Sequence, residues 1–423
     1  MSWRTCLIGE FVDSGSADIQ TGPFGTQLKA SDYVPNGTPV INVRNIGYAN
    51  LRPDKLEYVG EQVTNRLHVH LLREDDIVLG RKGAVDRHLF VTSEQEKWMQ
   101  GSDCIRLRLE DKEILPRFLS YAFLLPNHQQ WMLTQSGNKA TMASLNQDII
   151  KRIPVRFPSR PVQIDIVQTL SAYDDLIENN RRRMALLEDA ARQVYQEWFV
   201  RLRFPGYEHI RIVDGVPEGW EKIQLQGIIN VTHGCAFQGC HFSEKPTSRL
   251  LTTPGNFRIG GGIKFDKLKF YSEEGPLELA YVFKPMDLML TMTDLSKMCD
   301  TLGFPAFVPK LDGQTFLHNQ RIGKVVPLGI FFPKHFLYCL LCNAQYRHHV
   351  VGAATGTTVK HTSPKRILSY TTTMPKLGTL IDTFEDFARP LFLQINSLIE
   401  TNQKLRTARD LLLPKLMSGE ISV

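Results

Sequence analysis

Four cysteines lie at spacings that could hold a metal ion. Cys339 and Cys342 form a CxxC pair, and the segment HGCAFQGCH, which begins at His233, holds two more cysteines between two histidines. A structural zinc ion needs four such ligands at suitable spacing, and no second CxxC completes a set. Because FLYCLLCN has the character of a buried helix, we interpret its cysteines as small core residues and expect no metal.

The motifs of common DNA- and nucleotide-processing enzymes are missing from the sequence. A DNA amino-methyltransferase needs a glycine-rich cofactor loop and an Asn/Asp-Pro-Pro-aromatic motif, yet the chain has no Pro-Pro pair. There is no GxxxxGK[ST] phosphate loop either. His348 and His349 are adjacent and would point in different directions on a helix. We therefore expect a chain that is not itself an enzyme.

The composition is that of a globular protein of two or three domains. The chain has 423 residues, of which 42% are apolar and 22% charged, and a net charge of +6 that permits a polyanionic partner. The N-terminus has no apolar core of signal-peptide length, and no run approaches the roughly 18 apolar residues of a membrane span. We expect an intracellular, cytoplasmic protein without membrane contact.

A phrase in the middle of the chain returns near its end, as LIENN from Leu176 and LIETN from Leu398. Around the first copy, apolar residues recur at steps of four and three, which is the 3.5-residue period of a long helix with a narrow packing seam. Ser159 and Pro161 suit the start of this helix. Its seam positions are Ile166, Leu170, Tyr173, Ile177, Asn180, Met184, Leu187, Ala191, Val194 and Trp198.

The second copy follows the same steps, although Pro390 and Pro414 fall within it and predict a kinked helix or several shorter ones. Asn180 and Asn402 occupy the same place in the repeat, and a buried asparagine can fix the register of a helix pair. We expect the two helices to pack against each other antiparallel. The second seam comprises Leu391, Ile395, Leu398, Asn402, Leu405, Arg409, Leu412 and Leu416.

The segments before the two helices share a layout but few residues. Each has a tryptophan near its start, a glycine-containing turn leading to phenylalanine, short strands, an apolar helical patch and a small polar loop. TMTDLSKMCD in the second segment replaces GRKGAVDRHL, so the glycine-rich turn is missing there. We predict an α+β fold in which two globular domains, residues 1–158 and 203–377, alternate with two long helices, residues 159–202 and 378–423. The helices would pair as an antiparallel coiled coil, which gives a pseudo-two-fold repeat.

The sequence resembles the specificity subunits of Type I restriction-modification systems over essentially its whole length. The terminal motif and the EWFV region are the most specific parts of the resemblance. The matching segments are DIQTGPFGTQLKASDYVPNGTPVINVRNIG, VLGRKGAV, SGNKATMASLNQDIIKRIPVRFPS, LIENNRRRMALLEDAARQVYQEWFVRLRFPGYE, VPEGWE and LLLPKLMSGEI.

The resemblance implies a non-catalytic subunit with two target-recognition domains, each of which reads one half of a bipartite, asymmetric site in double-stranded DNA. The helical regions would set the separation of the halves and dock methyltransferase (M) subunits, which we expect to number two. Restriction (R) subunits would complete the complex. S-adenosylmethionine, ATP and Mg²⁺ are expected on these partner subunits and no cofactor on this chain.

Basic and amide side chains in loops are the candidates for DNA contacts, because Arg and Lys can contact guanine and Asn can pair with adenine, while most basic residues meet phosphate. Each could instead be an ordinary solvated charge. The candidates are Lys29, Arg44, Asn45, Arg81, Lys82, Arg87 and Lys139 in the first domain and Arg249, Arg258, Lys264, Lys297 and Lys360 in the second.

The helix seam and partner contacts have their own candidates. Trp198 and Phe199 end the first helix, where they either anchor a methyltransferase subunit or close the helix pair against a domain. The full set is Ile177, Asn180, Met184, Leu187, Trp198, Phe199, Leu398, Asn402, Leu405 and Leu412.

Two other functions stay open at this point. A coiled-coil scaffold with duplicated protein-binding domains would have the same layout. Methyl transfer by the chain itself is a third hypothesis, which binding of S-adenosylmethionine by the isolated chain would favour.

Overall fold

Two long helices are the largest elements of the computed structural model, which describes residues 3–53, 55–137, 143–265, 268–330, 333–376 and 378–422. Helix α6 (Arg160–Tyr195) ends in a π-helical turn, Gln196–Val200, and helix α10 (Thr379–Ser418) is continuous. The division into shorter helices expected at Pro390 and Pro414 is therefore wrong, while the alternative of a kinked helix stays a prediction. Both prolines lie on the exposed face, where water can bond the carbonyl groups that lose their N–H partners.

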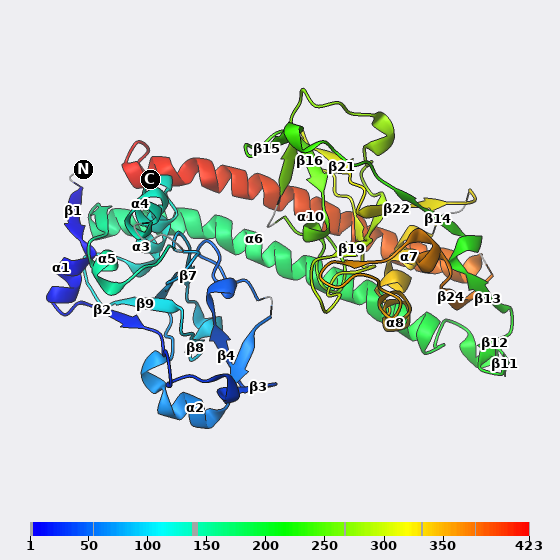
Figure 1. Ribbon diagram of the computed structural model, residues 1–423, viewed down its shortest axis with the longest axis horizontal. Coiled ribbons are helices and arrows are strands. Elements are labelled where there is room, and N and C mark those ends of the chain that lie inside the picture. Colours follow the sequence, from blue (N-terminus) through cyan, green and yellow to red (C-terminus); the bar gives the residue numbers. More distant parts are fainter. Residues whose placement is uncertain are drawn as a thin grey trace. The chain divides into compact units, whose positions relative to one another are not determined.

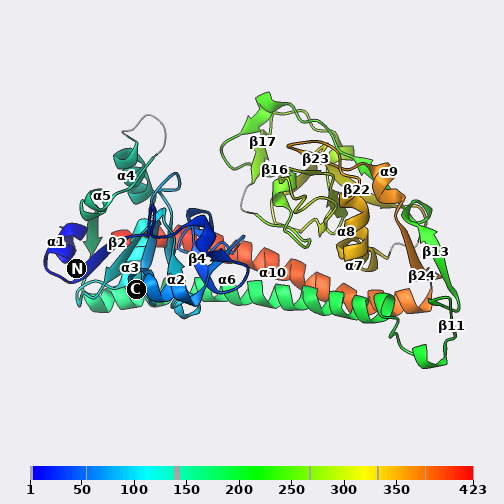
Figure 2. The ribbon, with the colours of Figure 1, turned by 60° about the horizontal axis from the view of Figure 1, so that its bottom comes forward.

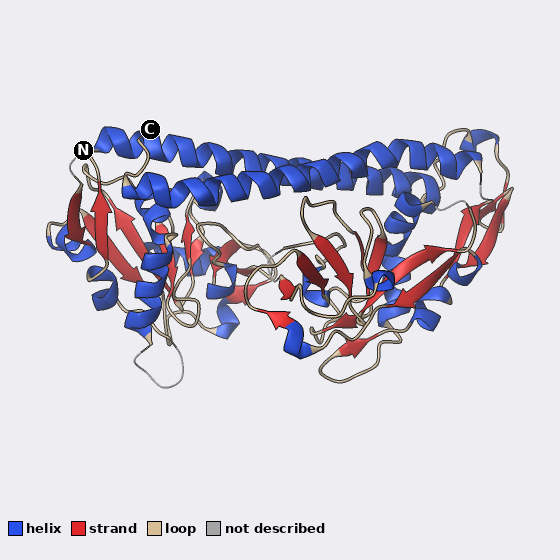
Figure 3. Ribbon diagram, turned by 90° about the horizontal axis from the view of Figure 1, so that it is seen from above, coloured by secondary structure: helices blue, strands red, loops and turns tan. Residues whose placement is uncertain are grey.

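The chain divides into two compact units, and each unit contains one globular domain with parts of both long helices. The first unit comprises residues 1–175 and 406–423, and the second comprises residues 176–405. Within each unit the segments of α6 and α10 lie side by side (Figure 3). No helix in the described ranges is both long enough and apolar enough to cross a membrane.

Side-chain contacts show that the helices pair antiparallel. In the second unit, Nδ2 of Asn180 donates to Oδ1 of Asn402 at 2.9 Å, and Nδ2 of Asn402 donates to the carbonyl of Ile177 at 3.2 Å. In the first unit, Nη1 of Arg409 donates to Oδ1 of Asp174 at 2.6 Å. Asp174 comes before Asn180 in α6, whereas its partner Arg409 comes after Asn402 in α10, so the two helices run in opposite directions. These contacts and the mixed domains confirm the predicted α+β fold with an antiparallel coiled coil.

The first unit holds two four-stranded sheets and a strand pair. One sheet has the antiparallel order β2–β9–β6–β7, the other has the order β3–β5–β4–β8, and β1 pairs with β10. The strands are β1 (Arg4–Leu7), β2 (Ala17–Thr21), β3 (Tyr33–Val34), β4 (Thr38–Ile41), β5 (Glu57–Val59), β6 (Ile77–Gly80), β7 (His88–Phe90), β8 (Met99–Gln100), β9 (Cys104–Leu109) and β10 (Pro154–Phe157). The helices are α1 (Ile8–Asp13), α2 (Glu61–Arg66), α3 (Pro116–Phe123), α4 (Pro126–Ser136) and α5 (Gln147–Lys151).

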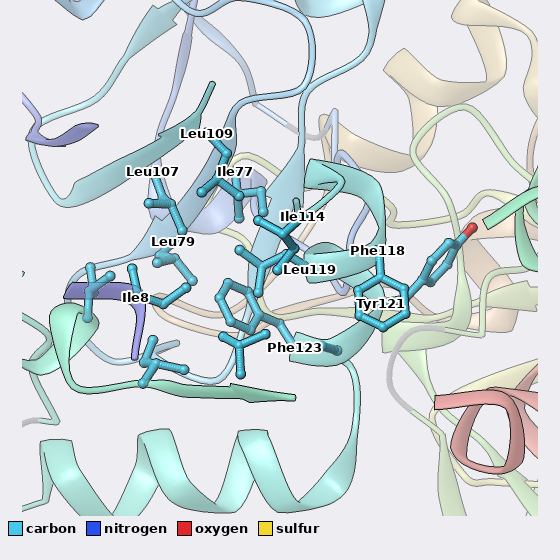
Figure 4. Packing of buried hydrophobic residues seen from close by; sticks show 14 of the residues in the cluster. Ile8, Ile77, Leu79, Leu107, Leu109, Ile114, Phe118, Leu119, Tyr121 and Phe123 are labelled. Carbon is cyan, nitrogen blue, oxygen red and sulfur yellow. The ribbon is translucent and has the colours of Figure 1, made fainter. Parts of the chain in front are cut away.

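The core of the first unit joins its main sheet to the long helices. Leu79 and Leu107 of the sheet share one buried cluster with Phe118 of α3 (Figure 4). The same cluster includes Ile166 of α6 and Leu413 of α10. The helix seam is therefore part of the domain core, so the domain and the coiled coil are stabilised together.

The second unit repeats this architecture. Its main sheet has the order β14–β22–β18–β20, a second sheet has the order β15–β17–β16–β21, and β13 pairs with β24 near the start of α10 (Figures 1 and 2). The strands are β11 (Ile212–Val213), β12 (Val216–Pro217), β13 (Trp220–Gln224), β14 (Ile229–His233), β15 (Phe242–Ser243), β16 (Arg249–Thr252), β17 (Lys269–Tyr271), β18 (Leu288–Thr291), β19 (Thr293–Asp294), β20 (Pro305–Phe307), β21 (Thr315–His318), β22 (Ile322–Pro327), β23 (Lys360–His361) and β24 (Thr371–Pro375). The helices are α7 (Lys334–Cys342), α8 (Ala344–Val351) and α9 (Pro364–Leu368).

The sequence repeat reaches further than the shared phrase. Gln163 of α6 and Glu385 of α10 stand at the same offset as the paired asparagines. Oε1 of Gln163 accepts from the backbone N–H of Leu115, just before α3, at 2.9 Å. Oε1 of Glu385 accepts from the N–H groups of His335 and Phe336, in the first turn of α7, at 2.9 and 2.8 Å. Each long helix thus caps the start of a helix in its own domain.

Replacing one seam asparagine should cost more than replacing both. Asn180→Leu leaves the buried amide of Asn402 without its side-chain partner, so we expect the free energy of unfolding to fall by about 1–3 kcal/mol. The double variant Asn180→Leu/Asn402→Leu should recover most of this loss but pair with a less defined register. Urea unfolding followed by circular dichroism measures both effects. The exposed neighbour Asn179→Leu is the control, and a double variant that is less stable than the single one would contradict the expectation.

Two buried histidines should make the fold sensitive to acid. Burial, helped by the nearby charge of Arg117, lowers the pKa of His88 to about 3, and burial lowers the pKa of His318 to about 4. An unfolded histidine has a pKa near 6.5, so below about pH 6.5 the unfolded chain binds more protons and stability falls as the pH falls. We expect up to about 1.4 kcal/mol per pH unit from each histidine. His88→Gln should flatten the profile of urea unfolding between pH 7 and pH 5, whereas exposed His209→Gln should leave it unchanged.

Candidate nucleic-acid interface

Four loops of the first unit lie in a row at one end of its main sheet. The N–H of Gly22 bonds the carbonyl of Cys104 at 2.9 Å, and the N–H of Arg81 bonds the carbonyl of Asp103 at 2.8 Å. The N–H of Leu145 in turn bonds the carbonyl of Arg81 at 2.8 Å. We call this row the first loop edge, and it comprises residues 22–25, 81–87, 101–103 and 143–145.

The second unit builds a similar row, in which two of the three backbone bonds match those of the first unit and the bond of the glycine loop has the opposite direction. The N–H of Gln320 bonds the carbonyl of Cys235 at 2.9 Å, and the N–H of Met292 bonds the carbonyl of Arg321 at 3.0 Å. The N–H of Thr362 then bonds the carbonyl of Met292 at 3.0 Å. This second loop edge comprises residues 234–238, 292–304, 319–321 and 354–362. The two edges share a scaffold of backbone bonds while their side chains differ.

A glycine starts each loop edge because the chains approach too closely for a side chain. A Cβ atom at Gly22 would lie 1.9 Å from the carbonyl oxygen of Gly101, and one at Gly234 would lie 2.1 Å from that of His318. Real Cβ atoms do not approach backbone oxygens so closely. The glycine turns predicted from the sequence thus shape the edge.

The first loop edge carries three of the predicted DNA contacts. The guanidinium of Arg81 lies 5.9 Å from the ring centre of Phe24, whose side chain is 60% exposed. Lys82 lies 3.2 Å from the carboxylate of Asp103. The guanidinium of Arg87 lies 5.4 Å from the ring centre of Tyr48. Lys139 lies outside the described residues.

The second loop edge carries two of the predicted residues and two exposed polar residues that the sequence analysis did not select. Lys297 is exposed in the loop after β18, and half-buried Lys360 stands in β23, which pairs with β19. Gln320 and Arg321 are exposed between β21 and β22. The polar run NQR between two apolar strands was the available signal for that turn.

Asn45 supports a turn and does not reach a base. It is fully buried, its Oδ1 accepts from the N–H of Asn42 at 3.1 Å, and its Nδ2 donates to the carbonyl of Arg52 at 2.9 Å. Asn256 holds the corresponding turn of the second unit, where Oδ1 accepts from the N–H of Thr253 at 2.8 Å. The prediction of Asn45 as a DNA contact is corrected, because burial assigns its amide to the backbone.

The other predicted contacts lie away from the loop edges. Lys29 is exposed in the segment that precedes β3. Arg44 forms a salt bridge with Glu57 at 2.7 Å. Nη1 of Arg249 donates to the carbonyls of Ser272 and Gly275, which follow β17, at 3.0 and 2.8 Å. Lys264 is half-buried after the turn that Asn256 holds. Their role in DNA contact stays a prediction.

Arg258 attaches a glycine-rich loop to helix α6. Its Nη2 and that of Arg192 each lie 2.5 Å from the carboxylate of Glu188, which also accepts from the hydroxyl of Tyr338. Burial and the adjacent carboxylate raise the pKa of Tyr338. Because charged hydrogen bonds of this kind are strong, Arg258 is occupied by the scaffold.

The predicted seam residues lie between the helices and the domains. Phe199 is buried in an aromatic cluster, 4.8 Å from Phe336 and 5.4 Å from Phe384 between ring centres, and half-buried Trp198 lies 6.2 Å from Phe384. This packing favours closure of the helix pair against the second domain over an exposed anchor. Asn180, Asn402 and Leu398 are buried, and the half-buried set is Ile177, Met184, Leu187, Leu405 and Leu412.

The CxxC pair belongs to the core of the second unit. Cys339 is buried in the main cluster and Cys342 packs against it. Burial raises the pKa of Cys342 to about 12, so the thiol stays protonated at neutral pH. Across the described ranges, no group of three or more His, Cys, Asp or Glu side chains is placed to hold a metal ion.

Comparison with known proteins relates the chain to one family. Residues 18–189 match the Type I restriction modification DNA specificity domain. The chain is 24% identical to the Type I restriction enzyme MjaIX specificity subunit of Methanocaldococcus jannaschii, over 73% of this chain and 70% of that protein. It is 22% identical to the MjaVIII specificity subunit of the same organism, over 84% and 80%. Residues 18–189 thus match a specificity domain, and the chain is similar over most of its length to Type I restriction enzyme specificity subunits.

A solved structure agrees with this likeness in fold. A crystal structure of the Type I restriction-modification S subunit from M. genitalium matches with a TM-score of 0.55 at 15% identity, covering 98% of this chain and 96% of that one. The match to the DNA specificity domain and the likeness to specificity subunits confirm two predictions, a DNA-binding function and a non-catalytic chain.

The short distances from a Cβ atom at Gly22 or Gly234 to neighbouring carbonyl oxygens predict that replacing either glycine lowers the stability of the fold. Gly22→Ala and Gly234→Ala force a Cβ atom against a carbonyl oxygen, so each should lower the free energy of unfolding by about 1–3 kcal/mol. Gly60→Ala and Gly239→Ala are the controls, because nothing lies within 4 Å of a Cβ atom there. Thermal unfolding measures the difference, and equal melting temperatures for all four variants would show that the loop edges adapt.

Proposed function

We propose that this chain acts as a specificity subunit and reads a bipartite, asymmetric target in double-stranded DNA, with one half-site read by each loop edge. The observation that carries the proposal is the repetition of one row of loops, held by similar backbone bonds, with different side chains in each copy. A fixed backbone that presents variable side chains is how a rigid scaffold supports recognition.

The charges at the first loop edge suit a base-reading surface. Arg81 and Arg87 are half-buried against aromatic rings, which limits the freedom of their guanidinium groups. A positioned guanidinium can bond O6 and N7 of guanine in the major groove. Lys82 forms a salt bridge with Asp103 and is better suited to contact a phosphate than a base. The second edge has no counterpart of these arginines in its loop after β18, so the two half-sites should differ.

The long helices suit a second role in the proposed complex. Two methyltransferase subunits would dock on them, and restriction subunits would join the assembly. S-adenosylmethionine, ATP and Mg²⁺ would bind those partner subunits. The helices would also set the separation of the half-sites, since α6 and α10 each extend through residues of both units.

Exchange of one domain tests the proposal directly. Residues 1–158 are replaced by the first domain of a relative with a different target, and the methylated sequences are mapped in cells that carry the methyltransferase subunit. We expect one half of the target to change while the other half and the spacing stay, because each edge reads independently. Exchange of residues 203–377 is the matched control and should change only the other half.

Three outcomes would contradict the proposal. Methylation that ignores both exchanges would favour a scaffold with protein-binding domains. Binding by the assembled complex without sequence preference would remove the reading function. Saturable binding of S-adenosylmethionine by the isolated chain would assign the cofactor to this subunit.

A further inference from the structure

The loop between β19 and β20 is held by hydrogen bonds at both of its ends. Asp294 is buried, and its carboxylate accepts hydrogen bonds from the N–H groups of Ser296, Thr301 and Leu302. At the far side, Nη2 of Arg347 donates to the carbonyl of Cys299 at 2.7 Å. The segment between these anchors, residues 295–298, therefore has a defined position at the second loop edge.

The segment between these anchors presents apolar side chains to solvent. The side chain of Leu295 is 66% exposed and that of Met298 is 78% exposed, with exposed Lys297 between them and Lys360 on the neighbouring strand. Single exposed apolar side chains are common on protein surfaces, so what distinguishes these two is their place in the proposed reading edge, beside two lysines.

The first loop edge has a different surface at the corresponding place. The turn after β6 carries Arg81, Lys82 and Arg87, and its one large apolar side chain, Val85, is fully buried. The two turns occupy equivalent places in the two loop edges. Arg81 bonds Asp103, just before β9, and Leu145, while Met292 bonds Arg321, just before β22, and Thr362. The contrast therefore lies in the recognition chemistry and not in the scaffold.

We propose that Met298 and Leu295 are specificity-determining residues that contact the C5-methyl groups of thymines in the half-site read by the second domain. This inference rests on the proposed function and names how one of its two edges reads DNA. The thymine methyl is the apolar group that a base edge offers in the major groove. Lys297 and Lys360 are placed to contact the phosphates beside it. Methionine suits such a contact because its side chain is flexible and polarisable.

The test removes the methyl group from the DNA and the side chain from the protein in turn. Once the target has been mapped, the complex of this subunit with its methyltransferase is titrated with duplexes in which single thymines are replaced by deoxyuridine. For the natural protein, deoxyuridine at one or more positions of the second half-site should weaken binding about four-fold, the effect of exposing one methyl-sized group. Met298→Ala or Leu295→Ala should weaken binding to the thymine duplex by a similar factor, and deoxyuridine at that position should then have no further effect.

The controls distinguish a failure of this inference from a failure of the proposed bipartite reading of DNA. Leu279→Ala, at a leucine that is 85% exposed elsewhere in the same domain, should leave both half-sites unaffected. Deoxyuridine in the first half-site should act equally on all variants. A second half-site without thymine, or the same deoxyuridine effect in the natural protein and both variants, would overturn the inference while the bipartite reading stands.

Fluorescence of 2-aminopurine that rises with the natural protein but not with Met298→Ala would show a wedge between bases and would also overturn the inference. A complex that needs only one half-site would instead contradict the proposed function.

Discussion

The hydrogen bond between Asn180 and Asn402 is a buried polar contact of the helix seam, and we expect it to fix the register of the two long helices. An apolar seam of 3.5-residue period can pair at more than one register with little loss of burial, whereas a buried amide pair meets its partner at only one. The seam residues also belong to the domain cores. Ile166 lies in the core of the first unit and Ala191 in that of the second. A shift of the helices would therefore disturb both cores, so a single polar contact has consequences well beyond the energy of one hydrogen bond.

Equivalent contacts also join each long helix to its own domain. Gln163 and Glu385 stand at equivalent positions and each caps a helix start in its own domain, although one is neutral and the other is an acid. The shared geometry thus survives a change of residue because both side chains offer an oxygen to a backbone N–H. The loop edges follow the same logic. Backbone bonds hold the rows in place, so the side chains that face outward can differ between the two copies without cost to the fold.

Part of the candidate site could be found from the sequence and part could not. The turn around Arg81 was predicted because glycine, lysine and arginine between apolar runs are typical of exposed loops, and Lys297 was selected as a basic residue in a loop. Asn45 has the same local character but is fully buried, since its amide completes a turn whose other partner, Arg52, follows seven residues later. Arg258 likewise meets Glu188, seventy residues away, in a contact that no local pattern reveals. Leu295 and Met298 were not considered, because exposed apolar side chains cannot be told from buried ones by residue type.

The sequence by itself determined the periodic features of this protein. The 3.5-residue seam, the repeated phrase and the duplicated layout are set by the spacing of apolar residues, which is local information and therefore readable along the chain. The tertiary structure decided which loops become neighbours, which polar side chains are buried, and that two prolines remain inside one continuous helix. These depend on contacts between residues far apart in the sequence, where packing and solvent exposure choose among conformations that local preference leaves open.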